Sequence, residues 1–493
     1  MRVLLFDPRR YRSFRPSTAP LGLLSIATYL NKNGHEAVIC DRSHTKEKTE
    51  KIIGDNKPDI IGVSVITYSA IKDALEIAAC AKKAGVIVVF GGAVATSLSE
   101  KFLENKNIDY ISLGEGEETW LEIAEALADK RSLEEIRGLA FSKNGKYFKT
   151  PEREFTDLTK LPKLDWTLIN PTDFLLSGFG GNKQANIYYS KGCTSDCSFC
   201  YNNEFHDCKR RCRNLDDVAD EMNYLIDTYG VDSFNFTDDL MFYSEGQATA
   251  IADTFIKKGI HNKCHWIGEI RIGVLKKREI FSLLYKAGCR NLIFGVETAS
   301  ADMQKVLNKR IRSETVEKTV ETCADSGITP LLTFMIGLPG ETEDDIRKTV
   351  ELVKKLDRAI CCIQLYTPTP GTRIYDQMVT EGKIRKDKTI EQFSKIVFGE
   401  KLYENITSVS KKDIHIVYRY LKLKEFTYKD QNSGDEQILK VIGNVLRSMS
   451  GKGIVFFFAA GFKNAKNLIQ LMSFFLHPRI RKKYGLYFRK NKN

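Results

Sequence analysis

The sequence predicts an α/β protein with a doubly wound parallel sheet, then a partial βα barrel, and then a helical region. Three observations favour this fold class. Apolar runs alternate with helical patterns of about 10–15 residues in residues 1–145. The same alternation restarts at Ala185, after a stretch that contains prolines. The 493 residues are also too many for one hydrophobic core, because cores stop growing at about 250–300 residues.

Residues 1–145 carry five apolar runs typical of strands and three stretches typical of helices. The expected strands are Arg2–Phe6, Ala37–Cys40, Ile60–Val65, Val86–Phe90 and Tyr110–Leu113, and the expected helices are Leu21–Leu30, Ile71–Ala84 and Trp120–Ala128. Such an alternation predicts a Rossmann-like, doubly wound parallel sheet. Ligands bind these sheets at the carboxyl ends of the strands. Gly91-Gly92 and Gly114-Glu-Gly116 follow two of those ends.

Residues 146–184 have no clear period and contain Pro151, Pro162 and Pro171, so we expect a linker. Residues 185–385 should form the second domain. Its expected strands are Ala185–Ser190, Ser233–Thr237, His265–Gly268, Asn291–Val296, Ile328–Ile336 and Cys362–Tyr366. Six βα units are fewer than the eight of a full barrel, which predicts a partial (β/α)6 TIM-like barrel. Residues 386–493 should be helical and basic. Their expected apolar helix face is Ile438, Leu439, Val441, Ile442, Val445, Leu446 and Met449.

A compact cysteine motif follows the first strand of the second domain. Cys193, Cys197 and Cys200 have the spacing C-x3-C-x2-C. A [4Fe–4S] cluster has four irons, each usually held by a cysteine, so three cysteines leave one iron open. An open coordination position is typical of a catalytic metal site. A zinc loop is the alternative, since His206, Cys208 and Cys212 lie nearby and could complete its ligands.

The motif, with Phe199 as the aromatic before its last cysteine, resembles the radical S-adenosylmethionine (SAM) superfamily. Four later segments resemble the strand ends that bind SAM in that family, in the family's order: Phe234–Met241, Trp266–Arg271, Gly295–Thr298 and Thr333–Thr342. The resemblance implies a [4Fe–4S] cluster on the three cysteines and SAM on its open iron. The SAM contacts it implies are Thr237, Asp238, Glu269, Arg271, Glu297, Thr298, Ile336 and Pro339. It further implies that reduction cleaves SAM to a 5′-deoxyadenosyl radical.

Taken singly, several of these residues also have plain structural interpretations. Glu297 or Arg271 could form a salt bridge in the barrel, and Gly337–Gly340 could be a turn. Asp238-Asp239 could cap a helix. The order of the segments, rather than any one residue, carries the resemblance.

The first domain resembles the cobalamin-binding domain that many radical SAM enzymes carry. The resemblance begins with Pro20–Leu30 and Gly34-His-Glu36. The cobalamin contacts it implies are Ser64, Thr67, Gly91, Gly92, Gly114, Glu115 and Gly116. No Asp-x-His-x-x-Gly motif occurs, and His35 and His44 are the domain's only histidines, so we expect no histidine ligand to cobalt. A nicotinamide site is disfavoured because G-x-G-x-x-G does not follow the first strand. Retention of the fold without cobalamin is the remaining alternative.

Positive charge is concentrated at the C-terminal end. No acidic residue follows Glu436, whereas twelve Lys and Arg do. The charge of this tail therefore equals the net charge of the whole chain, +12. The alternatives are a helical cap with a solvated basic face and peripheral contact with anionic lipid. Nucleic acid is disfavoured because apolar residues are as dense as basic ones there. The longest apolar runs are about nine residues, against roughly 20 for a membrane span. With no signal-peptide pattern, we expect a cytoplasmic protein.

Three functions stay open at this point. The first is methylation of an unactivated carbon on a small-molecule or lipid-like substrate. The second is a radical oxidation or ring closure, as in the anaerobic magnesium-protoporphyrin ester cyclases that this architecture resembles. The third is a non-catalytic cobalamin carrier or sensor. Methylthio transfer is disfavoured because no second cysteine triad precedes Cys193. Cys208 and Cys212 fit a second metal site or a substrate-facing surface, and flavodoxin or ferredoxin is the expected electron donor.

Overall fold

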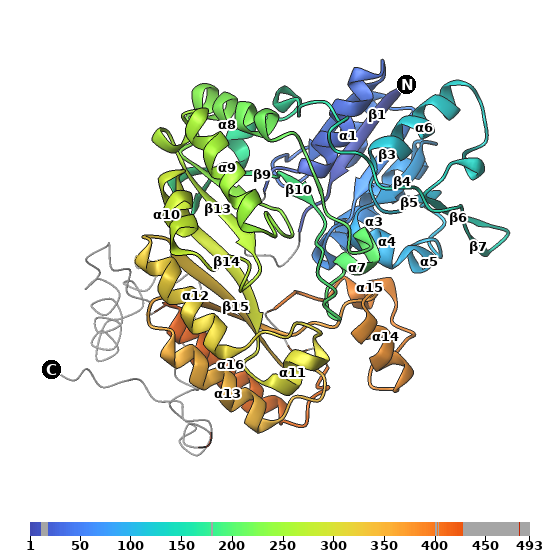
Figure 1. Cartoon of the computed structure of the whole chain (residues 1–493). Coiled ribbons are helices and arrows are strands. Elements are labelled where there is room, and N and C mark those ends of the chain that lie inside the picture. The colour runs from blue at the N-terminus through green and yellow to red at the C-terminus, as the bar shows by residue number, and fades with distance from the viewer. Residues whose placement is uncertain (11–17, 179–180, 400–401, 403, 427–482, 484–493) are drawn as a thin grey trace, which may run out of the picture. The chain divides into compact units, whose positions relative to one another are not determined.

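The computed structural model describes residues 1–10, 18–178, 181–399, 402, 404–426 and 483 (Figure 1). The chain divides into two compact units. The first comprises Met1–Glu269, Lys286–Cys289 and Pro368–Val397, and the second comprises Ile270–Tyr285, Arg290–Thr367 and Phe398–Asn493. None of the described helices is long and apolar enough to cross a membrane.

The first unit begins with a seven-stranded sheet in the order β2-β1-β3-β4-β5-β6-β7. Its strands are β1 (Arg2–Asp7), β2 (Glu36–Asp41), β3 (Ile60–Ser64), β4 (Ile87–Gly91), β5 (Tyr110–Ser112), β6 (Leu139–Lys143) and β7 (Lys146–Lys149). The first five strands are parallel, and β6 and β7 are antiparallel to their neighbours. The predicted doubly wound sheet is confirmed. The order 2-1-3-4-5 reverses direction between β1 and β3, where such sheets bind ligands.

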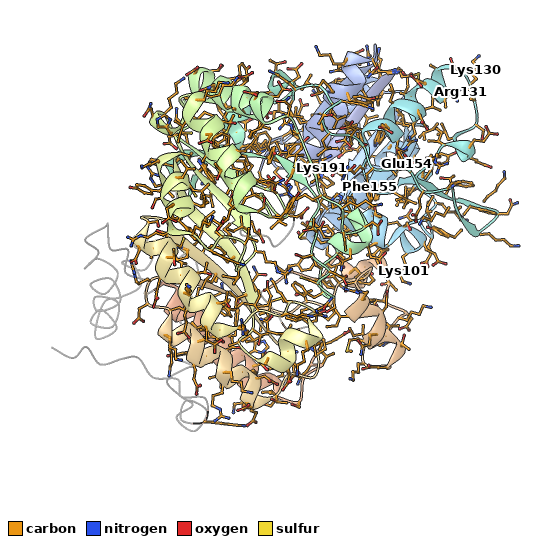
Figure 2. The ribbon with its side chains drawn as sticks, viewed as in Figure 1. Lys101, Lys130, Arg131, Glu154, Phe155 and Lys191 are labelled. Carbon is orange, nitrogen blue, oxygen red and sulfur yellow. The ribbon has the colours of Figure 1, made fainter. Side chains whose placement is uncertain are left out.

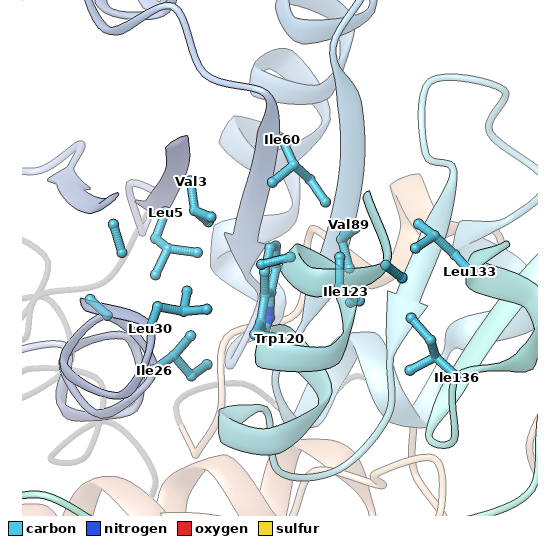
Figure 3. Close-up of a cluster of buried hydrophobic side chains, with 14 of the residues drawn as sticks. Val3, Leu5, Ile26, Leu30, Ile60, Val89, Trp120, Ile123, Leu133 and Ile136 are labelled. Atoms are coloured by element: carbon cyan, nitrogen blue, oxygen red, sulfur yellow. The ribbon is translucent and has the colours of Figure 1, made fainter. Parts of the chain in front are cut away.

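Helices follow the strands. They are α1 (Leu21–Lys32), α2 (Thr49–Asn56), α3 (Ile71–Lys83), α4 (Ala93–Ser97), α5 (Ser99–Phe102) and α6 (Glu117–Ala128). The three predicted ones are present as α1, α3 and α6, and α2, α4 and α5 were not predicted. Side chains of α1 and α6 form a buried cluster with one face of the sheet (Figure 3). Trp120 lies so close to β3 that a Cβ on Gly62 would be 2.6 Å from its ring and from Leu5 Cδ2. Glycine at this position therefore lets α6 pack tightly on the sheet.

The segment predicted to be a linker is more ordered than expected. Lys146–Lys149 forms β7 and pairs with β6, with Phe141 opposite Phe148, so the predicted linker segment begins with a strand. All four residues of β7 are exposed, and the alternation that marks a half-buried strand is therefore missing. Short 3-10 helices at Trp166–Leu168 and Pro171–Phe174 follow. The predicted domain boundaries themselves stay predictions.

The second sheet has the order β16-β15-β14-β13-β12-β9-β8. The first unit contributes β8 (Leu176–Gly178), β9 (Gly181–Ile187), β12 (Ser233–Phe236) and β13 (His265–Ile270), with helices α8 (Leu215–Tyr229) and α9 (Glu245–Lys257). The six strands predicted for the barrel are present as β9 and β12–β16. The pairs β9–β12 and β12–β13 are parallel, whereas β8 runs antiparallel to β9. The predicted partial barrel is confirmed.

The second unit carries three parallel strands, β14 (Cys289–Glu297), β15 (Thr329–Ile336) and β16 (Ile360–Leu365). Its helices are α10 (Arg278–Lys286), α11 (Ala301–Val306), α12 (Ser313–Asp325), α13 (Glu343–Lys355) and α16 (Lys411–Phe426). The first unit also contains α14 (Arg373–Thr380) and α15 (Ile390–Phe393). The helix face predicted between Ile438 and Met449 lies outside the described residues.

A buried carboxyl group closes the loop between β15 and α13. Glu341 is 0% exposed, and its Oε2 accepts hydrogen bonds from the backbone N–H groups of Gly337 (2.7 Å) and Leu338 (3.2 Å). Its Oε1 has no hydrogen-bond partner. Burial raises the pKa of Glu341 to about 8, despite these two donors. The folded protein therefore holds a protonated Glu341 at neutral pH.

We expect Glu341→Gln to change how stability depends on pH. In the wild type, the contribution of Glu341 to stability should be complete below pH 4.5, its ordinary pKa, and be lost as pH rises through about 8, because the folded state must then release a proton from a buried site. Glutamine keeps an acceptor for both N–H groups and does not ionise. We would measure the free energy of unfolding by denaturant at pH 6 and pH 9. Relative to the wild type, that of the variant should be higher at pH 9 than at pH 6, by up to a few kcal/mol.

Glu351→Gln, at an exposed position on α13, is the matched control and should show no such gain. Equal stability differences between Glu341→Gln and wild type at both pH values would contradict the assignment.

Candidate functional site

The loop that carries the three cysteines starts and ends at one short antiparallel ribbon. Strand β10 (Ser190–Lys191) pairs with β11 (Arg211–Cys212), and α7 (Asn202–His206) lies in the loop between them. Gly192 has φ +82°, and a Cβ there would lie 2.1 Å from the backbone oxygen of Lys209. Only glycine fits this position, because any side chain would collide with the returning chain.

The predicted cluster ligands are three cysteines in this loop that form no disulfide. Cys197 is buried, and Cys193 and Cys200 are partly buried. Burial raises the pKa of Cys200 to about 12, and the charges of Asp239, Cys197 and Cys193 act in the same direction. No three His, Cys, Asp or Glu side chains among the described residues have metal-binding geometry. The fit to a cluster therefore rests on the donors: three soft thiol ligands in eight residues.

The alternative zinc site, which His206, Cys208 and Cys212 would complete, has less support from the contacts of these residues. Arg210 Nη1 lies 3.0 Å from Cys212 Sγ, and a cation at that distance opposes binding of a divalent metal there. Cys208 donates to the side-chain oxygen of Asn203 at 3.3 Å. His206 is buried with Arg211 3.3 Å from its Nδ1, and burial lowers the pKa of its imidazole. These three residues therefore have protein partners already.

Two adjacent aspartates after β12 fix the start of the cysteine loop. Asp238 is 2% exposed, and its carboxylate accepts the backbone N–H of Tyr189 (3.0 Å) and the N–H and hydroxyl of Ser190 (2.6 and 2.5 Å). Burial raises its pKa to about 6. Asp239 accepts the backbone N–H of Gly192 at 3.1 Å and keeps more exposure. The carboxylate predicted to bind SAM, Asp238, is thus occupied by backbone groups, and Asp239 is the more accessible one.

The other predicted SAM residues of the first unit lie at strand ends. Thr237 follows β12 and makes both backbone and hydroxyl contacts with the backbone oxygen of Ile187, at 2.9 and 3.2 Å. Glu269 lies on β13, and its backbone oxygen accepts the N–H of Met241 at 2.8 Å. Both positions agree with the predicted order of segments, and their roles toward SAM stay predictions.

The second unit brings two predicted SAM residues together through a lysine that sequence reasoning missed. Lys309 Nζ lies 2.5 Å from Glu297 Oε1, and Arg271 Nη2 donates to the backbone oxygen of Lys309 at 2.6 Å. Glu297 and Lys309 are both nearly buried. Glu297 also has φ +71°, a strained value for a residue with a side chain. Strained residues cluster at ligand sites, which supports a binding role for this carboxylate.

The remaining SAM residues of the second unit are more enclosed than expected. Thr298 is 1% exposed, and its hydroxyl lies 3.2 Å from that of Thr349 and accepts the N–H of Ser300. It is therefore engaged in fixing the start of α11. Ile336 and Pro339 are buried at the end of β15 and in the following turn. Only backbone groups of this turn could meet a ligand without rearrangement of side chains.

The predicted cobalamin residues gather at the carboxyl ends of β3, β4 and β5. Ser64 is the last residue of β3, and Thr67 lies in the loop after it. Gly91 is the last residue of β4, its backbone oxygen accepts the N–H of Val65 at 2.7 Å, and Gly92 follows it. Gly92, at φ +92°, would place a Cβ 3.0 Å from the backbone oxygen of Val65. A Cβ on Gly114, in contrast, would meet nothing within 4 Å. This open position fits the close approach of a flat macrocycle.

An exposed apolar side chain lies at the same edge. Ile66, in the loop after β3, is 45% exposed and directly follows the buried Val65. His35 precedes β2, at the opposite edge of the sheet from the strand ends. His44 Nδ1 lies 3.1 Å from Asp41 Oδ2. The exposed Ile66 and the open position at Gly114 therefore fit cobalamin, and the expectation of no histidine ligand stays a prediction.

Glu115 and Gly116, the last two predicted cobalamin residues, have protein contacts instead. Arg211 donates two hydrogen bonds to the carboxylate of Glu115, at 2.7 and 2.8 Å. A Cβ on Gly116 would lie 2.6 Å from Ile26 Cδ1, so this glycine serves helix packing. Glu117, which sequence reasoning passed over, bonds to Lys191 at 2.7 Å. Burial alone would raise the pKa of Glu117, but Lys191 lowers it below its ordinary value. Figure 2 labels Lys191 on the cysteine-loop ribbon.

Comparison with known proteins agrees with this arrangement. The B12-binding domain family matches residues 12–124, and the radical SAM superfamily matches residues 187–353. An uncharacterized methyltransferase of Pyrococcus horikoshii is 29% identical over 391 residues, covering 76% of this chain and 83% of that protein. The anaerobic magnesium-protoporphyrin IX monomethyl ester cyclase of Rubrivivax gelatinosus is 26% identical over 396 residues, covering 77% and 70%.

A solved structure shares the fold across both domains. The radical SAM methyltransferase TsrM from Kitasatospora setae, with cobalamin and a [4Fe–4S] cluster bound, has a TM-score of 0.66 at 19% identity and covers 80% of each chain. At this identity the likeness shows the fold alone. Because a B12-binding domain and a radical SAM domain follow one another along the chain, the protein belongs to the cobalamin-binding radical SAM enzymes.

Proposed function

We propose that this protein methylates an unactivated carbon, using SAM at a [4Fe–4S] cluster on Cys193, Cys197 and Cys200 together with cobalamin. The observation that carries the proposal is the contact between the two cofactor loops within the first unit. Arg211 and Lys191, at the base of the cysteine loop, bond to Glu115 and Glu117 after β5. A methyl carrier and a radical generator must lie close together to act on one carbon.

The chain's own residues supply ligands, shape and charge. When bound, the cluster supplies the electron that cleaves SAM, and cobalamin supplies a carrier for the methyl group. Gly192 and Asp238 close and fix the loop that would hold the cluster. Ile66 and Gly114 offer an apolar, open surface for the corrin ring. Glu297, held by Lys309, presents a carboxylate suited to ribose hydroxyls.

Several relatives support methylation over the alternatives. Besides the Pyrococcus protein, cytidylyl-2-hydroxyethylphosphonate methyltransferase of Streptomyces wedmorensis is 23% identical over 451 residues, covering 79% of this chain and 84% of that protein. The Rubrivivax cyclase keeps a radical oxidation or ring closure as the second candidate, because its chain is matched over a similar length. A carrier or sensor is the third, and the cluster motif Cys193, Cys197 and Cys200, for which a carrier has no use, argues against it.

Product analysis of the reconstituted full chain tests this proposal. Anaerobic incubation with SAM and a chemical reductant should yield both S-adenosylhomocysteine and 5′-deoxyadenosine, because one SAM donates its methyl group and another is cleaved at the cluster. Liquid chromatography with mass detection would measure both products. Replacing Cys193, Cys197 and Cys200 by alanine should abolish 5′-deoxyadenosine, because the ligands are lost.

Each other outcome favours a different function. Deoxyadenosine without S-adenosylhomocysteine would contradict methylation and favour the cyclase-type reaction. Absence of both products from a chain loaded with cluster and cobalamin would favour a carrier or sensor.

We further propose a cytoplasmic location, an anaerobic reaction and reduction by a flavodoxin- or ferredoxin-type donor. All twelve cysteines are described and none forms a disulfide, which supports a reducing compartment. Tyr201, adjacent to Cys200, is 43% exposed and marks a surface near the loop that a donor could reach. The substrate is proposed to be a small molecule or a lipid-like compound.

We propose peripheral membrane contact for the basic tail, on sequence grounds. Residues after Glu436 include twelve Lys and Arg, no Asp or Glu, and the aromatic run Phe456-Phe-Phe. Vesicles with anionic lipid should co-sediment the full chain and not a chain truncated after Glu436, because each basic residue near an anionic surface contributes about 1 kcal/mol. Neutral vesicles are the control. Equal sedimentation of both chains with anionic vesicles would contradict the proposal.

A further inference from the structure

Two cations lie side by side at the base of the cysteine loop. Lys191 on β10 and Arg211 on β11 are opposite one another in the antiparallel ribbon. The 19 residues between them, 192–210, include Cys193, Cys197 and Cys200. Whatever holds these two side chains therefore holds both ends of the loop.

Both cations bond to carboxylates that follow β5: Glu115, in the loop that also carries Gly114, and Glu117, the first residue of α6. Arg211 Nη1 and Nη2 reach Glu115 Oε2 and Oε1 at 2.7 and 2.8 Å, a two-bond geometry that fixes orientation as well as distance. Lys191 Nζ lies 2.7 Å from Glu117 Oε1 and 3.9 Å from Glu115 Oε1. The positive charges of Lys191 and Arg211 thus neutralise the negative charges of Glu115 and Glu117.

The surroundings hold these groups in place. The side chains of Glu115 and Glu117 are 6% and 2% exposed. Ser25 Oγ donates to Glu117 Oε1 at 2.7 Å, and Arg211 Nη1 also donates to the backbone oxygen of Thr156 at 2.8 Å. The ring of Phe155 covers the guanidinium of Arg211 at 4.8 Å. Figure 2 labels Phe155 and Lys191 in this part of the first unit.

We infer that Glu115, Glu117, Lys191 and Arg211 are positioning residues that set the geometry of the cysteine loop relative to the cobalamin loop. The inference rests on the proposed function, since it assigns these residues to the step that needs both cofactors. Glu115 is then no cobalamin ligand, because both of its oxygens bond to Arg211. Transfer of a methyl group from SAM at the cluster loop to cobalamin requires close alignment, and a displacement of about 1 Å can slow such a step about 100-fold.

Arg211→Lys is the sharpest variant. Lysine keeps the positive charge but cannot form the two parallel bonds to Glu115. Arg153→Lys is the matched control, because Arg153 makes a similar two-bond contact with Glu122 on α6 (3.1 and 2.5 Å) and does not contact the ribbon. The two arginine side chains are similarly enclosed, with Arg153 13% and Arg211 18% exposed, whereas Glu122 is 44% exposed and Glu115 is 6% exposed. The control therefore matches the arginine and its two-bond geometry, and not the burial of its partner.

The first measurement needs no cofactor. Hydrogen–deuterium exchange of the full chain should be faster in both residues 110–119 and residues 190–213 of Arg211→Lys, and unchanged in α3. Arg153→Lys should leave residues 190–213 unchanged. The second measurement uses the loaded enzyme. S-adenosylhomocysteine formation should fall by about tenfold or more in Arg211→Lys, while 5′-deoxyadenosine formation, which needs the cluster loop alone, falls less than about threefold.

With Arg211→Lys, the variants Glu115→Gln and Glu115→Gln/Arg211→Lys form a double-mutant cycle. Because the two residues act as a pair, the double variant should be no slower than the slower single variant. If Arg211→Lys does not fold, Lys191→Arg replaces it as the ribbon variant. It should also lower S-adenosylhomocysteine formation more than 5′-deoxyadenosine formation.

Two results would overturn the inference. One is unchanged exchange in residues 110–119 and 190–213 of folded Arg211→Lys. The other is an equal fall, or no fall, in both products. Failure of the proposed function is distinguishable, since a wild type that forms no S-adenosylhomocysteine would refute methylation while the exchange experiment still tests the link between the loops.

Discussion

The cysteine loop can close only because the chain returns to its starting point without a side chain in the way. At Gly192 a Cβ would lie 2.1 Å from the backbone oxygen of Lys209, so the loop ends meet through glycine alone. Asp238 then fixes the two residues before the loop through their backbone N–H groups. The position of Cys193, Cys197 and Cys200, and of any cluster that they hold, depends on this closure.

The same closure determines where charge is placed. It sets Lys191 opposite Arg211, and these cations bond to Glu115 and Glu117 from the sheet of the B12-binding domain. Buried ion pairs contribute little net stability, because desolvation offsets much of the attraction, but loss of one partner leaves a buried unpaired charge. Such pairs therefore specify one arrangement of the two loops more than they stabilise the fold. This suits two cofactors that must act on the same substrate.

The sequence predicted the five parallel strands of the first sheet, the six strands of the partial barrel and the cysteine loop, because these follow from local periodicity and spacing. It could not predict which charges meet, since Glu115 and Arg211 are 96 residues apart and either one alone resembles a surface residue. Lys309 was missed for the same reason: its contact with Glu297 depends on a turn that brings the two together. Asp238 was predicted as a ligand contact, and only the structure shows that backbone groups occupy its carboxylate. The strand β7 was missed because its side chains are all exposed.

The central claim is that Cys193, Cys197 and Cys200 hold a cluster with one iron open to SAM. Electron paramagnetic resonance of the reduced, reconstituted full chain, recorded with and without SAM, tests it most directly. The account predicts a [4Fe–4S] signal whose g values shift when SAM binds the open iron, and loss of that signal when the three cysteines are replaced by alanine. A signal that SAM leaves unchanged, or that survives the alanine replacements, would contradict it.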